Sequence, residues 1–537
     1  MSSSDPPPAT RLFRELRRPA ASLTAAELLS AIVGLGLVLR YLWLVDDSFI
    51  YFRYVDNLVF LGRGLVFNAG EYVEGFTSPA FALLLAALRL TRLDFFSLIG
   101  GIAVLSFLGA FALWLRVDRA LAGPIRLSLP ALLLAPCYGV TQYFSSGLET
   151  PLVLLSASVT AVFILERRSR LWGILFGLVP IVRHELAVPF VLVLLWFSVR
   201  ERRVPWWPLG SAALSVGGWL CFRVYYYAEL LPNTFYLKDE SSPQQGLLYL
   251  QNSFGPYPLV YVAVGALALL GYLAVRRRAP LRSEARMVML VAALASLGYV
   301  VRVGGDMLHF RFVLFPAVLL ALSSSGSLEA VLARAGVVPG RVPRALLAVA
   351  LLAAGAACYP AQLQSHPLSL HEKMQKVNGI SESSWHRQQA DLAFRAGRPA
   401  EDRAQRAAYA QYLTSGARSQ GLVLHGWCAK LYKDFPSYAL HDWGLTDPWL
   451  ARLNVPADRP GHKGALNRVF GPQLFRMRQR VAPGPGAVQA AVQGGHAPPF
   501  IQKNQKTAEV IEAKAYNRHD FFDNLRLALT RVPKLEP

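Results

Sequence analysis

Charged residues are scarce in this chain of 537 residues. Asp, Glu, Lys and Arg make up only 17% of it, whereas 53% is hydrophobic and the mean hydropathy is +0.33. Because soluble domains carry about one quarter charged residues, this deficit indicates a protein that faces lipid. There are four cysteines, and their spacing matches neither a zinc site nor a disulfide framework. No GxGxxG or P-loop sequence is evident, so nothing in the chain indicates a bound nucleotide.

Long apolar runs fill the first two thirds of the chain. The runs 25–45, 95–115 and 287–301 resemble membrane spans, which are typically about 17–25 residues long. The segment 361–537 has no comparable run. We therefore expect a membrane domain over 25–360, preceded by a basic cytoplasmic N-terminus (1–24) and followed by a soluble domain (361–537).

The net charge of +21 comes from arginines placed in short loops between the apolar runs. A basic chain can bind nucleic acid, but this placement is typical of the excess of Lys and Arg in cytoplasmic loops of membrane proteins. We expect no nucleic-acid partner. Arg11, Arg14, Arg17 and Arg18 precede the first run, which predicts a retained signal anchor with the N-terminus in the cytoplasm.

One topology places every arginine-dominated loop between spans on the cytoplasmic side. It is an α-helical protein of about eleven membrane helices in a bacterial inner (plasma) membrane, with the C-terminal domain outside the cytoplasm. Its first external loop is large (46–94) and contains an interfacial helix at 79–90. The two short runs 171–182 and 186–199 decide on which side of the membrane the later loops lie. A single long helix in their place would invert the orientation of all later spans. The predicted spans are 25–45, 95–115, 127–143, 151–165, 171–182, 186–199, 206–224, 257–275, 287–301, 312–325 and 345–360.

Polar residues gather on the outer side of this topology. Charged groups at membrane depth cost about 2.5–3.5 kcal/mol each, so they usually face a polar cavity or a partner. Asp46 and Asp47 directly follow the first span. Adjacent carboxylates raise one another's pKa, bind a metal or divide the roles of base and support. The alternative is an ordinary polar helix boundary.

The sequence Arg183-His184-Glu185 lies between two short apolar runs. It is either an internal salt bridge that ties a re-entrant hairpin or an arginine that binds phosphate, which its planar fork suits. Lys238 and Arg302 are further phosphate candidates, with simple anchoring at the membrane interface as the alternative.

Two strand-like runs, 421–425 and 437–440, flank an expected helix at 427–433 in the C-terminal segment. Together they predict a small α/β layer. We also expect helices at about 383–413, 507–515 and 519–531, and a loose Pro/Gly/Ala-rich connector at 482–499. This domain is expected to bind the acceptor or to cover the site.

Five stretches of the sequence resemble a known family. They are DDSFIYFRYVDNLVFLGRGLVFNAGEYVEGFTSP (46–79), SGLETPL (146–152), LPNTFYLK (231–238), VGGDMLHFRF (303–312) and DWGLTDPWLAR (442–452). With the acidic pair, the many spans and the C-terminal domain, they resemble GT-C type polyprenyl-phosphate-dependent glycosyltransferases, in particular the mycobacterial terminal β-arabinofuranosyltransferase group. One departure is that relatives usually carry an Arg-Pro-Glu block where this chain has Arg183-His184-Glu185.

The resemblance implies an inverting transfer of a sugar, arabinofuranose in that group, from a polyprenyl-phosphate donor to an envelope glycan or glycolipid. It favours Asp46 as base and Asp47 as its support. The residues themselves do not distinguish which of the two has which role. It leaves a divalent cation open, because the family includes metal-free and metal-assisted members. The candidate donor-phosphate residues are Arg53, Arg183, Lys238, Arg302 and Arg311. The candidate substrate-binding residues are Glu74, Glu149, His184, Glu185, Asn233, Asp306 and His309.

Two other function classes are weighed against an enzyme. A transporter or flippase of a lipid-linked glycan needs polar residues along the midplane and a cytoplasmic route, whereas the inner half of the predicted bundle is apolar with arginine ends. An envelope scaffold gives no reason for so many charged groups at one outer rim.

Overall fold

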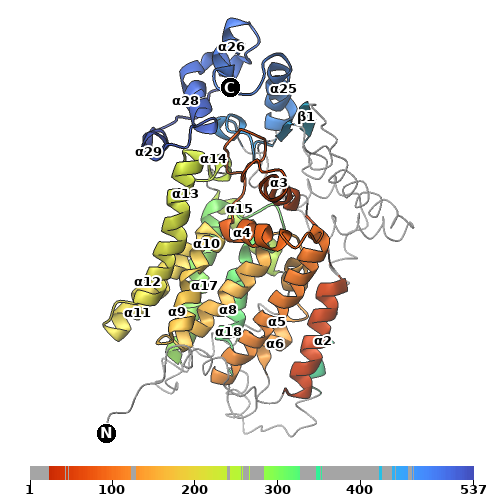
Figure 1. Cartoon of the computed structure of the whole chain (residues 1–537). Helices are drawn as coiled ribbons and strands as arrows, with labels where there is room; N and C mark the ends of the chain where they lie inside the picture. The colour runs from red at the N-terminus through yellow and green to blue at the C-terminus, as the bar shows by residue number, and fades with distance from the viewer. Residues whose placement is uncertain are drawn as a thin grey trace, which may run out of the picture.

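A helical bundle with a smaller C-terminal part at one end forms the protein, as a computed structural model shows (Figure 1). The structure describes residues 23–40, 42, 44–45, 47–121, 128–238, 242–255, 257, 265, 283–326, 346, 348–350, 352–353, 422–425, 438–441, 443–456, 463 and 465–537.

The bundle is built around α5 and α8, which pack against each other. On the far side of α8 lies α18, which in turn packs along α17. Apolar side chains from these helices form one continuous core, whose burial stabilises the bundle. Its main helices are α2 (Ala25–Arg40), α5 (Phe95–Leu121), α8 (Thr150–Leu165), α9 (Arg170–Gly177), α11 (Ala187–Glu201), α12 (Trp206–Ala212), a π-helix (Ala213–Gly217), α13 (Gly218–Tyr227), α17 (Ser283–Val303) and α18 (Leu314–Ser323).

Two of the described helices, α5 and the segment Glu284–Val303 of α17, are long and apolar enough to cross a membrane. Shorter apolar helices lie at Pro79–Arg89, Thr150–Leu165, Arg170–Val182 and Arg311–Ser323. These findings fit a helical membrane protein, while the number of eleven spans stays a prediction. Most of the predicted spans 257–275 and 345–360 lies outside the described residues.

The prediction of one continuous helix at 127–143 is wrong. The chain forms α6 (Leu129–Leu134), then α7 (Tyr138–Thr141) and a 3-10 turn at Gln142–Phe144. Cys137, which follows Pro136, has an extended backbone (φ −73°, ψ 114°). Proline lacks the N–H that a helix interior needs and its ring clashes with the preceding turn, so the helix is interrupted there.

The short pair of helices is a hairpin. After α10 (Val179–Val182), Arg183 is extended (φ −155°, ψ 138°), and a 3-10 turn at His184–Leu186 leads into α11. The far ends of the pair meet again, because Nε of Arg167 lies 2.6 Å from Oε1 of Glu201. A single long helix, the alternative that would invert the topology, is therefore excluded.

The first long loop contains two helices. The helix predicted at 79–90 is confirmed as α4 (Pro79–Arg89), while its position at the membrane interface stays a prediction. Ser78 caps this helix by accepting a hydrogen bond from the N–H of Phe81 at 3.3 Å. The second, α3 (Ser48–Val59), was not predicted, since its aromatic and β-branched residues have modest helix propensity. Burial of nine of its twelve residues stabilises it instead. After α13 the chain forms α14 (Asn233–Leu237) and α15 (Pro243–Phe254).

Both predicted strands of the C-terminal part are confirmed. β1 (Leu422–His425) pairs in parallel with β2 (Tyr438–His441), with Leu422 opposite Tyr438. The expected helices at 383–413 and 427–433 lie outside the described residues. The other short elements are a 3-10 turn (Leu450–Arg452), a π-helix (Leu466–Phe470), α25 (Gly471–Arg480), α26 (Ala487–Gln493), α27 (Pro499–Lys503), α28 (Gln505–Ala515) and α29 (Phe521–Leu529). The last two confirm the helices predicted near the C-terminus.

The prediction of a loose connector at 482–499 is wrong, because α26 lies within it. Val488 and Ala491 of this helix are fully buried. The Glu512 carboxylate accepts hydrogen bonds from the N–H groups of Gly486 (2.9 Å) and Val488 (2.8 Å), which caps the start of the helix. The Pro and Gly residues of this segment flank the helix instead of disrupting it.

The C-terminal part packs on the end of the bundle that carries α3, α13 and α14 (Figure 1). The side-chain amide of Asn68 acts as a strand partner for Ala439, accepting from its N–H at 2.9 Å and donating to its carbonyl at 3.0 Å. The N–H of Tyr72 donates to the carbonyl of Ala515 at 2.7 Å. Backbone contacts therefore fix the first loop against the C-terminal part.

Candidate functional site

Four segments that are distant in sequence meet at the end of the bundle on which the C-terminal part packs. They are the start of α3, the loop 145–149 before α8, the hairpin tip 183–186 and the segment 304–313, which ends in the 3-10 turn Arg311–Val313. The N–H of Val45 donates to the carbonyl of Ser146 at 2.9 Å, which holds the first two segments together. Gly147 has φ +78°, and a Cβ there would lie 3.0 Å from Cβ of Ser48. Only glycine lets these two segments approach so closely.

Glu149 is the centre of this cluster and is fully buried. Its Oε1 accepts hydrogen bonds from Nη2 of Arg311 at 3.1 Å and from Nη1 of Arg183. Burial acts to raise the pKa of Glu149, but the charges of Arg311 and Arg183 outweigh it and lower the pKa to about 2. The group is therefore a carboxylate under all physiological conditions.

Arg311 connects Glu149 to the other acids. Its Nη1 lies 3.4 Å from Oδ2 of Asp306 and 4.0 Å from Oδ2 of Asp47. Arg183 pairs through Nε with Glu185, and its guanidinium carbon lies 4.9 Å from the centre of the Phe312 ring. Two buried guanidinium groups thus stand side by side, with carboxylates between and around them.

Asp47 has the most accessible carboxylate of the cluster. Its side chain is 32% exposed, whereas that of its neighbour Arg311 is 9% exposed. Partial burial raises the pKa of Asp47, and the nearby charges of Arg311 and Lys238 act in the opposite direction. A carboxylate with a raised pKa that solvent or a substrate can reach is suited to accept a proton. Asp46, its predicted partner, lies outside the described residues.

A cavity of about 400 Å³, counting its open mouth, lies beside the two arginines between α8, the hairpin tip, α17 and α18. Its polar lining is Thr150, Arg183, Glu185, Ser296, Tyr299 and Arg311. Its apolar lining is Val153, Leu186, Val300, Phe312, Phe315 and Pro316. The cavity thus combines two arginines with apolar walls, the two properties that the binding of an anion on an apolar chain requires.

Most of the predicted residues near the hairpin tip are brought together. His184 is half exposed, with Nδ1 3.7 Å from Oε2 of Glu185, and burial lowers the pKa of His184. Lys238 follows α14 and is close enough to lower the pKa of Asp47. Arg302 lies in the last turn of α17. The predicted residues that the cluster unites are Asp47, Glu149, Arg183, Glu185, Asp306 and Arg311.

Two other predicted residues of the first loop form internal contacts, one within the loop and one with α13. Arg53 donates from Nε to the carbonyl of Phe67 at 2.7 Å, and its guanidinium group packs over the Phe67 ring. Glu74 forms a buried ion pair with Arg223 and accepts a hydrogen bond from Nε1 of Trp219 at 3.1 Å. These contacts place both charges inside the protein and outside the cluster around Glu149.

Asn233 and His309 are also placed in structural contacts. The amide of Asn233 donates to the backbone carbonyls of Gly444 and Leu445 at 3.1 and 3.0 Å, which ties α14 to the C-terminal part. The His309 ring lies between the hydroxyl of Tyr257 (3.1 Å) and Oδ1 of Asn252 (2.8 Å). Burial lowers the pKa of His309 to about 4, so the ring is neutral.

Tyr51 belongs to the cluster, although the sequence did not single it out. Its hydroxyl donates to Oε2 of Glu149 at 3.3 Å and accepts from the N–H of Ser78 at 3.2 Å. A signal was present, since Tyr51 lies four residues after Asp47 and so shares its side of a helix. This spacing is informative only if the helix α3 has already been predicted.

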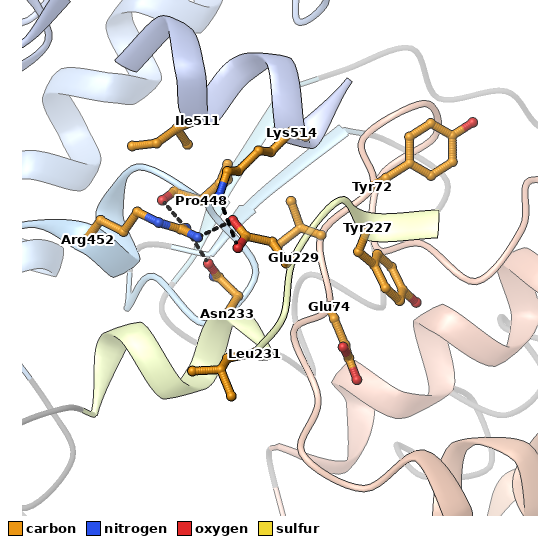
Figure 2. Close-up of a pocket in the computed structure, with 12 residues that line it drawn as sticks. Tyr72, Glu74, Tyr227, Glu229, Leu231, Asn233, Pro448, Arg452, Ile511 and Lys514 are labelled. Carbon is orange, nitrogen blue, oxygen red and sulfur yellow. Dashed lines mark hydrogen bonds and ion pairs between the residues drawn. The ribbon is translucent and has the colours of Figure 1, made fainter. Parts of the chain in front are cut away.

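A second cavity, of about 290 Å³ with its mouth, lies at the junction with the C-terminal part (Figure 2). Glu229 stands between Arg452 and Lys514, pairing with Nη2 of the first and lying 3.3 Å from Nζ of the second. Nη1 of Arg452 also donates to Oδ1 of Asn233 at 3.2 Å. These ion pairs join the two parts of the protein. No pattern in the sequence predicted them.

Within the part of the chain that the structure describes, no three His, Cys, Asp or Glu side chains are grouped so that they could hold a metal ion. Asp46, which neighbours Asp47, is outside that part.

Two known proteins are similar to this chain, whereas no protein-family model and no solved structure matches it. A terminal β-(1→2)-arabinofuranosyltransferase of Mycobacterium tuberculosis is 30% identical over 349 residues, which cover 56% of this chain and 53% of that protein. One of Corynebacterium glutamicum is 30% identical over 328 residues, which cover 52% of this chain and 48% of that protein. The chain spans about half the length of the relatives that it matches. The resemblance predicted from the sequence motifs is therefore confirmed: this chain is similar to the terminal β-(1→2)-arabinofuranosyltransferases of mycobacteria and corynebacteria.

Proposed function

We propose that this protein is a membrane glycosyltransferase that moves an arabinofuranosyl group from a polyprenyl-phosphate donor to a hydroxyl of an envelope glycan or glycolipid. The reaction takes place on the outer side of the plasma membrane, at the end of the bundle on which the C-terminal part packs. The printed activity of the two relatives supports the transfer of arabinose. The observation that carries the proposal is the pair of buried arginines beside a partly exposed Asp47, next to a cavity with apolar walls.

We place the donor at this cavity. An isoprenoid chain would lie against its apolar walls, and the phosphate would meet Arg183 and Arg311 at the outer end. Arginine suits a phosphate because its planar fork donates two parallel hydrogen bonds. Without an anion between them the two guanidinium groups would repel, and Glu149 supplies that anion. Lys238 and Arg302 are additional cations at this rim, and His184 and Glu185 are placed to contact the sugar.

The transfer needs one base and one stabilised leaving group. A carboxylate of the pair Asp46-Asp47 removes the proton of the acceptor hydroxyl, and the hydroxyl oxygen forms a bond to the anomeric carbon. The bond from that carbon to the phosphate oxygen breaks on the opposite face, which inverts the configuration. The phosphate leaves with the bonding electrons, and the arginines stabilise its added charge. The resemblance favours Asp46 as the base, with Asp47 in support.

The test is transfer by the full chain in nanodiscs, with a synthetic polyprenyl-phosphoryl arabinofuranose donor and an oligo-arabinofuranoside acceptor. Loss of the base is expected to lower the rate by about 10²–10⁴-fold, so Asp46→Asn and Asp47→Asn are compared at equal folded protein. Asp94→Asn is the matched control, because Asp94 is an acid of the same long loop whose carboxylate accepts hydrogen bonds from Ser97 at the start of α5. Parental rates in both Asp46→Asn and Asp47→Asn would rule out the mechanism. Movement of a lipid-linked glycan across the bilayer without any product would support a transporter instead.

A further inference from the structure

We infer that the C-terminal helix α29 lies on the outer surface of the lipid bilayer, with Phe522 and Leu529 inserted among the lipids. This contact would hold the C-terminal part over the catalytic cluster. It rests on the proposed membrane location of the bundle, and concerns an interaction surface that the sugar transfer itself does not require.

The helix α29 has three distinct sides. Asn524 and Ala528 are buried against the protein. Phe522 and Leu529 lie on a second side, with side chains 73% and 64% exposed, and Arg526 stands between them with its long side chain 85% exposed, so that its charged end can reach the headgroups. Asp523 occupies the third side, which is polar. A helix that exposes large apolar residues next to a charged side is typical of segments that lie in a membrane interface.

The position of α29 is fixed by the outer end of α13. The side-chain amide of Asn524 donates to the carbonyl of Tyr225 at 2.7 Å, and that of Asn517 donates to the carbonyl of Tyr226 at 3.1 Å. The His519 ring stacks on Tyr226, with ring centres 4.8 Å apart. These amides satisfy carbonyl groups that the last turn of a helix leaves free. The helix α29 therefore lies beside the end of α13 (Figure 1).

The dimensions of α12 and α13 place that end at the lipid surface. The helical run from Trp206 to Tyr227 extends for about 32 Å at about 1.5 Å per residue, close to the roughly 30 Å of a bilayer's hydrocarbon core. Exposed aromatic residues stand at both ends, Trp206 at one and Tyr225 at the other. Leu214, between them, is 81% exposed. Aromatic residues at both ends of an apolar stretch mark the two membrane interfaces.

The charges around α29 complement an anionic lipid surface. Arg518, Arg526, Arg531 and Lys534 outnumber Asp520 and Asp523 in this segment. Basic residues beside an apolar helix face strengthen its binding to membranes that contain anionic lipids. The apolar side of α29 thus continues the lipid-facing surface of α13, and its basic neighbours would lie at the level of the headgroups.

The experiment measures the depth of single nitroxide labels on the full chain in nanodiscs that contain phosphatidylglycerol. The four cysteines are replaced, and one cysteine is introduced as Phe522→Cys, Asp523→Cys or Leu214→Cys. Collisions with oxygen, which concentrates in lipid, are compared with collisions with a water-soluble nickel chelate. We expect labels at 522 and 214 to favour oxygen and the label at 523 to favour nickel.

The label at 214 separates this inference from the proposed membrane location. Oxygen contact at 214 with nickel contact at 522 would overturn the inference and leave the location intact. Nickel contact at both positions would overturn both. If the cysteine-free chain does not fold, a photo-crosslinking amino acid at the same three positions of the native chain replaces the labels. Lipid adducts at 214 but none at 522 would then overturn the inference.

Discussion

The Glu149 carboxylate lies 3.1 Å from Nη2 of Arg311, although 162 residues separate the two in the sequence. The same carboxylate oxygen also accepts a hydrogen bond from Arg183, which comes from the hairpin tip. One buried acid therefore brings together the two guanidinium groups that we propose bind the donor phosphate.

Removing this charge is expected to affect both stability and transfer. Glu149→Gln leaves two buried guanidinium groups without their shared anion, which costs about 3–5 kcal/mol of unfolding free energy. Misplacement of the arginines should lower the transfer rate by about 10²–10³-fold. Thermal unfolding and initial rates of transfer in nanodiscs measure the two effects.

The control is Glu166→Gln, which carries the same substitution. Glu166 pairs with Arg116 at 2.6 Å where both side chains are 24% exposed, so its loss should cost less than about 1 kcal/mol and leave transfer unchanged. A Glu149→Gln protein with parental stability and rate would show that the carboxylate does not organise the site.

The pH dependence of transfer should reveal the charges around Asp47. Partial burial raises the pKa of Asp47, so activity is expected to fall with decreasing pH at a value above the ordinary pKa of an aspartic acid. Lys238 lowers the pKa of Asp47, and Lys238→Met should therefore move this acid limb to higher pH. The measurement is kcat/KM across pH, with Lys506→Met, an exposed lysine of α28, as the control. If the acid limb of Lys238→Met lay at the same pH as that of the parent, the proposed charge coupling would be contradicted.

Asp447 should make stability depend on pH. Burial, reinforced by the charge of Glu71, raises the pKa of Asp447 to about 7, whereas an unfolded aspartic acid titrates near about 4. The folded state therefore binds the proton of Asp447 more tightly than the unfolded state does. The contribution of Asp447 to the free energy of unfolding is greatest below about pH 4 and is lost as the pH rises toward 7. Each pH unit in this window corresponds to about 1.4 kcal/mol at most.

The variant Asp447→Asn should flatten this dependence. An amide keeps the oxygen that accepts hydrogen bonds from the N–H groups of Trp449 (3.0 Å) and Leu450 (2.8 Å), but it does not titrate. Unfolding temperatures of the full chain at pH 5 and pH 7 are compared, with Asp520→Asn, an exposed cap of α29, as the control. An equal difference between the two pH values in parent and Asp447→Asn would refute the assignment.

The contact between Glu229 and Arg452 is expected to hold the C-terminal part on the bundle. Both side chains are mostly buried, so Glu229→Gln leaves Arg452 and Lys514 without their shared carboxylate and should cost about 3–5 kcal/mol. Arg452→Met should cost less, because Glu229 keeps Lys514 as a partner. The double variant should cost less than the sum of the two, because each single variant already removes the attraction between Glu229 and Arg452. Hydrogen exchange of residues 443–456 reports the opening of this junction.

The exposed pair Arg526 and Asp523, with side chains 85% and 73% exposed, provides the matched control. Its removal should change neither stability nor exchange. Strictly additive effects of Glu229→Gln and Arg452→Met would show that the ion pair does not couple the two parts.

Local sequence patterns were sufficient to predict much of the architecture. The apolar runs gave the positions of α5, α8, α17 and α18, because lipid-facing and buried helices need long apolar stretches. Short, mostly apolar runs likewise predicted β1 and β2. The pattern failed at 127–143, where Pro136 interrupts the helix, and at 482–499, where Gly and Pro concealed the short helix α26.

The sequence by itself determined which residue types the site contains and at which end of the bundle they lie. Only the tertiary structure decided which of them meet. Asp47, Glu149, Arg183 and Arg311 share one cluster, whereas Arg53 is bound within the first loop. The physical reason is that a buried charge must have partners, and here those partners lie on segments up to 264 residues away, as for Asp47 and Arg311. Spacing along the chain carries no information about contacts of that range.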